Sequence, residues 1–222
     1  MDNELIFRQA QSCETDRIMQ IIRQAQARMH AAGSRQWQDG YPAPGHISAD
    51  IGRNRGYVLC KPGVEGPLSV IAYGAVVFDG EPAYDAIDGQ WLTDEPYVLV
   101  HRIAVADGER GRGVAAEFLH RVETLAQERG VKAFRIDTNF DNQTMLRLLE
   151  RTGFTYCGKV VYRSGERLAY EKRILKHSDT KNRTRGSTPR VLSFHCSARH
   201  YLLEEILQRN IVIIAQISQR RQ

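Results

Sequence analysis

A basic, glycine-rich loop at residues 110–115 is the stretch of this sequence best suited to chemistry. It reads Arg-Gly-Arg-Gly-Val-Ala and follows a run of β-forming residues. Gly111 and Gly113 allow positive φ and leave the main-chain amides open to a ligand. The first amides of a helix have no acceptor within the helix and lie at the positive end of its dipole. Because Arg110 and Arg112 add full positive charge, the loop predicts a phosphate-binding site.

The spacing within this loop argues against the two common nucleotide-binding motifs. A mononucleotide loop needs Gly-x-x-x-x-Gly-Lys-Ser/Thr and the dinucleotide fingerprint needs Gly-x-Gly-x-x-Gly, but position 116 is Ala and no Lys-Ser/Thr pair follows. The pattern Arg110-x-x-Gly113-x-Ala115 instead resembles the Arg/Gln-x-x-Gly-x-Gly/Ala loop of the GCN5-related N-acetyltransferases (GNAT). The resemblance implies that the loop wraps the pyrophosphate of acetyl-coenzyme A (acetyl-CoA). A solvated turn that caps an ordinary helix is the alternative interpretation.

A second stretch, residues 137–154, resembles the same family. It begins Asp-Thr-Asn-Phe-Asp-Asn and ends Leu-Leu-Glu-Arg-Thr-Gly-Phe, and in the family a strand ends in Asn before a helix that leads into Gly-Phe. The resemblance covers residues 4–175. It implies an α/β fold with a central, twisted, mixed sheet of about six or seven strands, mostly antiparallel and flanked by helices. One parallel strand pair should splay apart at the cofactor site.

The resemblance also implies which residues hold acetyl-CoA. Backbone groups of the central strand and side chains after the next strand would contact the pantetheine arm, while the glycine loop would bind the pyrophosphate. The expected set is Ile103, Ala104, Val105, Arg110, Gly111, Arg112, Gly113, Val114, Ala115, Asn139 and Asn142. The two asparagines can equally be turn and helix-cap residues.

The reaction of such a site requires proton transfer as well as positioning. An amine attacks the thioester carbonyl, so the enzyme must keep the amine neutral, stabilise the carbonyl oxygen and help the thiolate depart. His101, on the central strand, is a candidate general base, or else a packed and hydrogen-bonded histidine. Strand alternation places His101, Ile103 and Val105 on one face and Arg102 on the other.

The residue that would protonate the leaving thiolate is less evident. Many members of the family carry a tyrosine in Tyr-Glu-Lys-x-Gly-Phe, but here that position is Leu149, which has no proton to donate. Tyr156 or Tyr162 could serve, water could serve, or the thiolate could leave unaided because it is a fair leaving group near neutral pH. Asp94 and Glu95, at the start of the central strand, are further candidate bases.

Large aromatic side chains stand in two polar connections. Trp37 and Tyr41 lie in the Gly/Pro-rich segment 34–45, and Trp91 lies in segment 79–96. They either cover the edge of the core or wall an acceptor pocket. Acidic residues in the second segment could attract a cationic amine, although charge on a loop is usually solvated. The acceptor is left open as a small-molecule, peptide or protein amine.

Hydrophobic periodicity predicts the elements that must position these residues. We expect a buried central strand at 97–105, a helix at about 113–129 and a strand at 131–137, which together form a parallel, right-handed βαβ unit. Elsewhere we expect a strand at 5–8, a helix from about residue 15 to Gly33, a short helix at 46–53, strands at 57–60 and 69–78, a helix ending near Gly153 and two closing strands. Residues 79–96 should form a long polar connection.

Charge divides the chain into two parts. Up to Leu175 there are 22 Lys and Arg against 23 Asp and Glu, whereas the rest of the chain carries 9 against 3. The net charge of +5 therefore belongs to the C-terminal part. We predict a GNAT domain at 1–175, a basic linker at 176–190 and an appendage of unknown role at 191–222. This tail lacks any motif that reads a nucleic-acid groove, so specific nucleic-acid binding is not expected.

Composition bounds the remaining possibilities. The four cysteines lie far apart with no Cys-x-x-Cys, so no zinc site or disulfide framework is indicated, and we expect no metal. Without a signal peptide or an apolar run of spanning length, we expect a cytoplasmic protein with no membrane span. Whether the chain forms a homodimer is left open. Two functions stay open. One is transfer of an acetyl group from acetyl-CoA to a primary amine; the other, suggested by the missing tyrosine, is a non-catalytic acyl-CoA sensor.

Overall fold

The computed structural model describes residues 4–63 and 68–175. Its strands are β1 (Ile6–Gln9), β2 (Gly56–Lys61), β3 (Ser69–Val77), β4 (Asp88–Gly89), β5 (Tyr97–Val105), β6 (Ala133–Thr138), β7 (Thr155–Tyr162) and β8 (Gly165–Arg173). Its helices are α1 (Thr15–Ala31), α2 (Pro44–Gly52), α3 (Val114–Glu128) and α4 (Gln143–Arg151), with 3-10 turns at Ser12–Glu14, Pro82–Tyr84 and Asp107–Glu109. The predicted linker and appendage at 176–222 lie outside the described residues.

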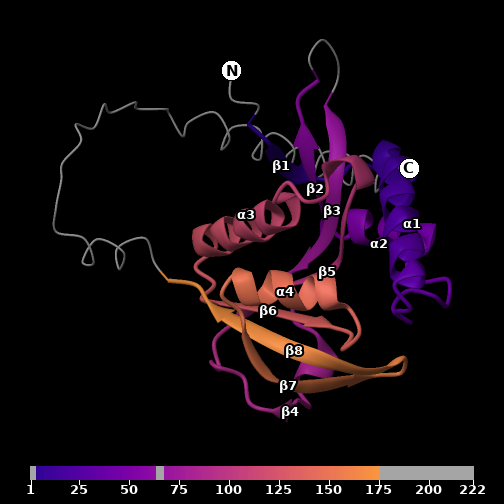
Figure 1. Ribbon diagram of the computed structural model, residues 1–222. Coiled ribbons are helices and arrows are strands. Elements are labelled where there is room, and N and C mark those ends of the chain that lie inside the picture. The colour runs from indigo at the N-terminus through magenta and orange to yellow at the C-terminus, as the bar shows by residue number, and fades with distance from the viewer. Residues whose placement is uncertain (1–3, 64–67, 176–222) are drawn as a thin grey trace, which may run out of the picture. The chain divides into compact units, whose positions relative to one another are not determined.

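The described strands form one eight-stranded sheet in the order β1-β2-β3-β5-β6-β8-β7-β4, flanked by the helices (Figure 1). The pair β5–β6 is parallel, and the other pairs are antiparallel. This confirms the expected mixed sheet and the parallel βαβ unit. The strand count exceeds the expected one because part of segment 79–96 is not a plain connection. Its strand β4 pairs with Gly158 and Lys159 of β7 at the edge of the sheet.

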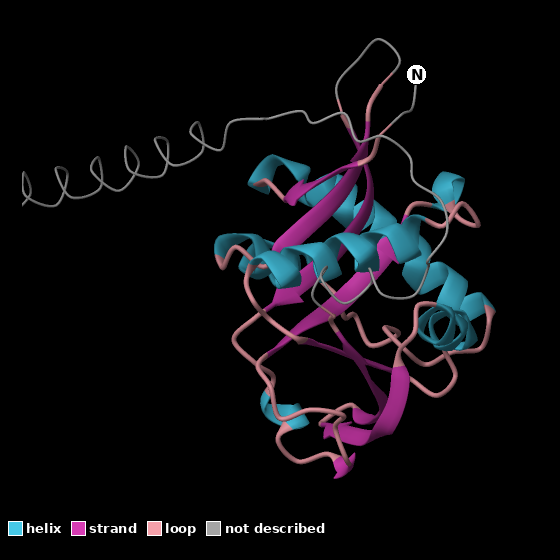
Figure 2. Ribbon diagram, turned by 90° about the vertical axis from the view of Figure 1, so that its left-hand side faces the viewer, coloured by secondary structure: helices cyan, strands magenta, loops and turns pink. Residues whose placement is uncertain are grey.

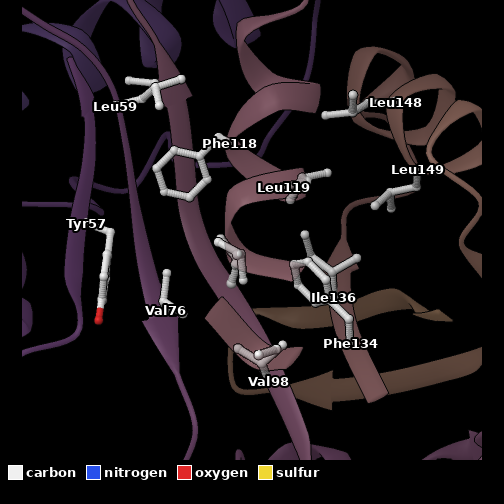
Figure 3. Packing of buried hydrophobic residues seen from close by; sticks show 14 of the residues in the cluster. Tyr57, Leu59, Val76, Val98, Phe118, Leu119, Phe134, Ile136, Leu148 and Leu149 are labelled. Carbon is white, nitrogen blue, oxygen red and sulfur yellow. The ribbon is translucent and has the colours of Figure 1, made fainter. Parts of the chain in front are cut away.

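Helices α3 and α4 cover one face of the sheet with a shared core. The buried residues of α3 recur at three- and four-residue spacing, as an amphipathic helix requires: Val114, Phe118, Leu119, Val122 and Ala126. They meet strand residues such as Leu59, Val76 and Ile136 and the α4 residues Leu148 and Leu149 (Figure 3). This core holds the start of α3, and therefore the glycine loop, against the end of β5.

Helices α1 and α2 cover the opposite face with a second core. Ile18, Ile21 and Ile22 of α1 and Ile47 of α2 are fully buried there against β2 and β3. The ribbon seen from the side shows helices on either side of the twisted strands (Figure 2). In the part of the chain that the structure describes, no helix is long and apolar enough to cross a membrane.

Strands β5 and β6 pair over only part of their length. The parallel register joins Tyr97 with Ala133 and ends where Leu99 meets Arg135. Beyond that pair β5 continues to Val105 and β6 to Thr138 without pairing with each other. The two strands therefore part toward their carboxyl ends, as the family resemblance implied.

Strand β5 carries a β-bulge where it parts from β6. Ala75 pairs with His101 and Tyr73 pairs with Ala104, so β5 has two residues opposite one residue of β3. Arg102 occupies the bulge with φ of 58°, the left-handed region that a non-glycine residue rarely adopts. An extra residue in one strand reverses the alternation of side chains beyond it.

The bulge makes the expected alternation along β5 wrong. Val98 and Val100 belong to the core under α3, and Ile103 and Val105 also pack against that core. Uninterrupted alternation would have put residues 102 and 104 there instead. His101, one residue after Val100, consequently lies on the opposite face from Ile103 and Val105, on the side of the sheet covered by α1 and α2.

Candidate active site

The gap between β5 and β6 opens into a cavity of about 860 Å³. Residues 100–103 of β5 line one side, and residues 136–138 of β6 with the following Asn139 line the other. The loop after α1, helix α2 and the β7–β8 hairpin supply the remaining walls. The cavity thus gathers side chains from segments far apart in the sequence.

His101 and Glu81 form a hydrogen-bonded pair on the β5 side of the cavity. The imidazole Nε2 lies 3.0 Å from Oε2 of Glu81, and both side chains are about four-fifths buried. The other carboxylate oxygen of Glu81 accepts a hydrogen bond from the backbone N–H of Ala83 at 3.3 Å. The hydrogen bond with His101 holds the pKa of Glu81 below its usual range. Glu81 is therefore ionised at neutral pH and can stabilise a protonated His101.

Asp137 lies on the β6 side and accepts two tyrosine hydroxyls on the same oxygen. Tyr84 Oη donates to Oδ2 at 2.8 Å and Tyr162 Oη donates to it at 3.0 Å. Burial raises the pKa of both tyrosines, and the negative charge of Asp137 raises it further. Both hydroxyls consequently remain protonated donors. Among the described residues, the second oxygen, Oδ1, has no hydrogen-bond partner.

A buried ion pair fixes the bulge beside the cavity. Arg102 donates from Nε and Nη2 to the two carboxylate oxygens of Asp50 on α2, at 2.8 and 2.6 Å, and from Nη1 to the Tyr41 hydroxyl at 2.5 Å. Tyr73 Oη donates to Asp50 at 2.7 Å. Burial raises the pKa of Tyr41 and of Tyr73, so neither hydroxyl ionises at neutral pH. The positive charge of Arg102 is thereby neutralised within the protein.

The loop after α1 is tied to the turn between β6 and α4. Ser34 Oγ donates to Asp141 Oδ1 at 2.8 Å, and the Arg35 backbone N–H donates to Oδ2 at 3.0 Å. Asn142 Nδ2 donates to Gln36 Oε1 at 2.8 Å. These bonds hold the loop against a turn that lies more than a hundred residues away in the sequence, and the loop becomes a wall of the cavity.

Two buried polar atoms at the end of β6 lack partners within the described structure. They are Thr138 Oγ1 and Asn139 Oδ1, in residues that are 1% and 7% exposed. Both residues line the cavity. A buried polar group without a partner is costly, and this cost is removed if a ligand supplies the missing hydrogen bond.

The glycine loop has the backbone that an anion site needs. Gly111 and Gly113 have φ of 74° and 79°, and a Cβ built on either would meet no atom within 4 Å. Gly113 is the N-cap of α3, and the residue four positions on donates its N–H to the Gly113 carbonyl at 2.9 Å. Arg110 and Arg112 are exposed, with Arg112 3.5 Å from the Glu109 carboxylate. Helix start, open glycines and two arginines therefore lie together.

The model of the acetyltransferase (GNAT) family matches residues 20–154. The chain belongs to this family. A GNAT acetyltransferase from Streptococcus agalactiae is 39% identical, with 78% of this chain and 96% of that one covered and a TM-score of 0.69. A comparison with curated proteins found no match.

Two more distant structures share the GNAT fold. A GNAT-family acetyltransferase from Listeria monocytogenes is 18% identical, with 76% of this chain and 94% of that one covered and a TM-score of 0.60. YncA from Salmonella typhimurium, solved with its cofactor acetyl-CoA, is 15% identical, with 78% and 96% covered and a TM-score of 0.54. At these identities the likeness concerns the fold alone.

The GNAT domain brings seven of the seventeen sequence-predicted site residues to one cavity. Those that line it are Trp37, Tyr41, His101, Ile103, Asn139, Asn142 and Tyr162. Asn142 is also the N-cap of α4, accepting the backbone N–H of Met145 at 3.1 Å. The glycine loop lies outside this cavity, at the start of α3.

Three other residues lie away from the cavity. Tyr156 is 51% exposed and packs edge-on against Tyr170. Trp91 packs against Tyr84 and Arg135 and donates its indole N–H to the Tyr84 carbonyl at 3.0 Å. Leu149, at the family's tyrosine position, is fully buried in the core under α3 and α4. Helix α4 therefore presents no proton donor at that position.

Sequence reasoning did not single out Glu81, Asp137 or the Asp50–Arg102 pair as site residues. Glu81 belonged to an acidic loop, and Asp137 was only the end of a strand. A signal for Asp137 did exist, because a charged residue at the carboxyl end of a parallel strand lies at the edge where ligands bind. No local pattern indicated the partner of His101.

Proposed function

We propose that this GNAT protein transfers an acetyl group from acetyl-CoA to a primary amine by direct attack while both substrates are bound. The observation that supports it best is the parting of β5 and β6 into a cavity that contains the unpartnered atoms of Thr138 and Asn139. A thioester arm with amide and carbonyl groups is the kind of ligand that satisfies such atoms. The family membership favours the same reaction.

The residues present fit acetyl-CoA, which supplies the activated acyl group. The start of α3 and the arginines of the glycine loop would hold the pyrophosphate. Ala106 donates its N–H to the Ile71 carbonyl at 2.8 Å, so alternation along the ladder directs the N–H of Val105 away from β3, toward the parted side. The Val105 carbonyl already accepts a hydrogen bond from Arg28 at 3.2 Å. The backbone N–H of Val105 is thus the group that would donate a hydrogen bond to the pantetheine arm and orient it.

His101 is our proposed general base. It lines the cavity beside the parted strands, and Glu81 offers negative charge to the imidazolium that forms when His101 takes the proton of the attacking amine. Tyr162 is our proposed proton donor for the leaving thiolate, because it lines the cavity and burial keeps it protonated. Its proton now lies toward Asp137, so donation requires that hydrogen bond to break. Tyr156 does not line the cavity, and we assign it no role.

Calorimetric binding of acetyl-CoA tests the cofactor site. Gly113→Glu puts bulk and negative charge where we place the pyrophosphate, and we expect it to abolish the binding that the wild type shows. Gly113→Ala is the matched control, because both variants place a Cβ at a φ of 79° and pay the same backbone cost. We expect the alanine variant to bind. No binding by a folded wild-type protein would refute the proposal.

Release of free thiol with a panel of amines separates an enzyme from the alternative acyl-CoA sensor. The buried Leu149 is the observation that keeps this alternative open. A transferase releases thiol only when an acceptor amine is present. Tight acetyl-CoA binding without thiol release for any amine would favour the sensor.

A further inference from the structure

We propose that Asp137 positions the acceptor through its ammonium group, and that the acceptor is an alkyl amine without a carboxylate beside its amino group. This inference deepens the proposed function and rests on it, since it names the substrate class of the same cavity.

Asp137 and His101 flank the same gap. Each lies two residues beyond the last parallel pair of β5 and β6, on its own strand. The residues just before them, Ile136 and Val100, belong to the core under α3. Both polar side chains therefore point to the other face, and both line the cavity. An amine held by Asp137 is consequently beside the proposed base.

Asp137 is a fixed carboxylate that lacks a cation. The hydroxyls of Tyr84 and Tyr162 both bond Oδ2, which sets the orientation of the group. In the two described ranges, no Lys, Arg or His nitrogen lies within 4.0 Å of it. Its Oδ1 is left to accept a charge-assisted hydrogen bond, which is the strong kind. An ammonium group supplies both the donor and the positive charge.

Asp137 adjoins the end of the cavity where we place the thioester arm. The next two residues, Thr138 and Asn139, carry the buried atoms that lack partners in the described structure. Both are more than nine-tenths buried and line the same cavity. Asp137 therefore does not stand alone as an acidic group on a surface.

Arg102, which follows the proposed base on β5, is not available for a carboxylate of the acceptor. Arg102 donates hydrogen bonds from Nε and Nη2 to Asp50 and from Nη1 to the Tyr41 hydroxyl. A carboxylate next to the reacting amine would instead meet the negative charges of Asp137 and Glu81. Because like charges in a partly buried cavity repel strongly, α-amino acids are disfavoured there.

The other arginines of the cavity wall do not offset the negative charge of Asp137 and Glu81. Arg35 and Arg53 are exposed to solvent. Arg55 pairs with Asp79, and Arg167 donates to the Glu166 carbonyl and to a serine hydroxyl. The Arg167 guanidinium lies 6.0 Å from the centroid of the Tyr162 ring. In the described ranges none of these arginines lies within 4.0 Å of Asp137, and the inference allows them to meet an anionic group elsewhere on the acceptor. It excludes only a carboxylate beside the amino group.

Matched pairs of acceptors that differ by one carboxylate test the selectivity. They are phenethylamine with phenylalanine and histamine with histidine, each assayed by thiol release with acetyl-CoA. We expect the amine of at least one pair to be turned over, with a kcat/KM at least about tenfold above that of its amino acid. A site discriminates by about this factor against a substrate whose charged group, here the carboxylate, is left without a partner.

The variant Asp137→Asn tests the residue. Loss of a hydrogen bond to a charged group predicts a rise of about tenfold to a hundredfold in the KM of the preferred amine. The KM of acetyl-CoA should not change. Calorimetric binding of that amine, measured with coenzyme A present, should weaken by the same factor, which a purely structural role would not produce. Asp85→Asn, an exposed aspartate outside the cavity, is the matched control and should bind as the wild type does.

The outcomes separate the two proposals. A folded wild type that does not bind acetyl-CoA refutes the proposed function and this inference together. A protein that binds acetyl-CoA but turns over the amino acids as well as the amines refutes only this inference. One that binds acetyl-CoA but turns over none of the panel refutes this inference and favours the acyl-CoA sensor. Unchanged amine binding in Asp137→Asn also refutes it.

Discussion

Asp50→Asn should destabilise the protein far more than an equivalent change at its surface. Asp50 is 6% exposed and forms a two-bond ion pair with Arg102, whose side chain is 14% exposed. The amide keeps the shape but removes the charge, so Arg102 is left with an unpaired, largely buried guanidinium. Breaking a buried pair in this way costs about 3–5 kcal/mol. Because Arg102 lines the cavity, water can compensate in part, and we expect about 3 kcal/mol.

The surface pair of Asp79 with Arg55 is the matched control. The Asp79 side chain is 65% exposed, and pairs of this kind contribute about 0–1 kcal/mol. Urea unfolding of the wild type, Asp50→Asn and Asp79→Asn gives the three free energies of unfolding. If Asp50→Asn costs no more than Asp79→Asn, the buried pair does not stabilise the bulge as we argue.

Three further predictions follow from individual contacts. Gly74→Ala should lower the free energy of unfolding by about 1–3 kcal/mol, because its Cβ would lie 2.8 Å from a phenyl ring of α3, whereas Gly45→Ala meets no atom within 4 Å and should cost less. Hydrogen bonds from Arg8 hold the pKa of Glu14 below its ordinary value of 4.5, so the ionised carboxylate stabilises the native state above that pH, and the stabilisation is lost as pH falls through the lowered pKa. Glu14→Gln should therefore lower stability at neutral pH and flatten its fall below pH 4.5 in pH-dependent urea unfolding; identical curves would contradict this. His101→Ala should lower kcat about 10²- to 10⁴-fold with the KM of acetyl-CoA unchanged, and an unchanged kcat would exclude His101 as the base.

Most elements could be predicted from the sequence because their signals are local. The helix expected at about 113–129 is observed as Val114–Glu128, since its apolar spacing and its closing glycine both lie within the segment. The glycine loop before it also has the expected left-handed glycines. Even the alternative for Asn142 was visible, because a helix cap depends on residues three positions away.

Two features of the sheet escaped sequence analysis because they depend on a distant strand. The two-residue strand β4 exists only because Gly89 meets Gly158, and its own residues, Asp and Gly, are poor strand formers. The bulge at Arg102 arises from the register between β3 and β5, which periodicity within β5 does not contain. That one extra residue puts Ile103 and Val105 on the opposite face from His101, contrary to the predicted alternation.

The sequence by itself determined the fold class, the central βαβ unit and the position of the glycine loop, because periodicity, glycines and helix starts are properties of neighbouring residues. Only the tertiary structure decided the constellation around the cavity. Glu81 reaches His101 across 20 residues, Arg102 reaches Asp50 across 52, and Tyr84 reaches Asp137 across 53. Contacts at such separations form only when the sheet assembles its strands, so no local pattern encodes which carboxylate meets which partner.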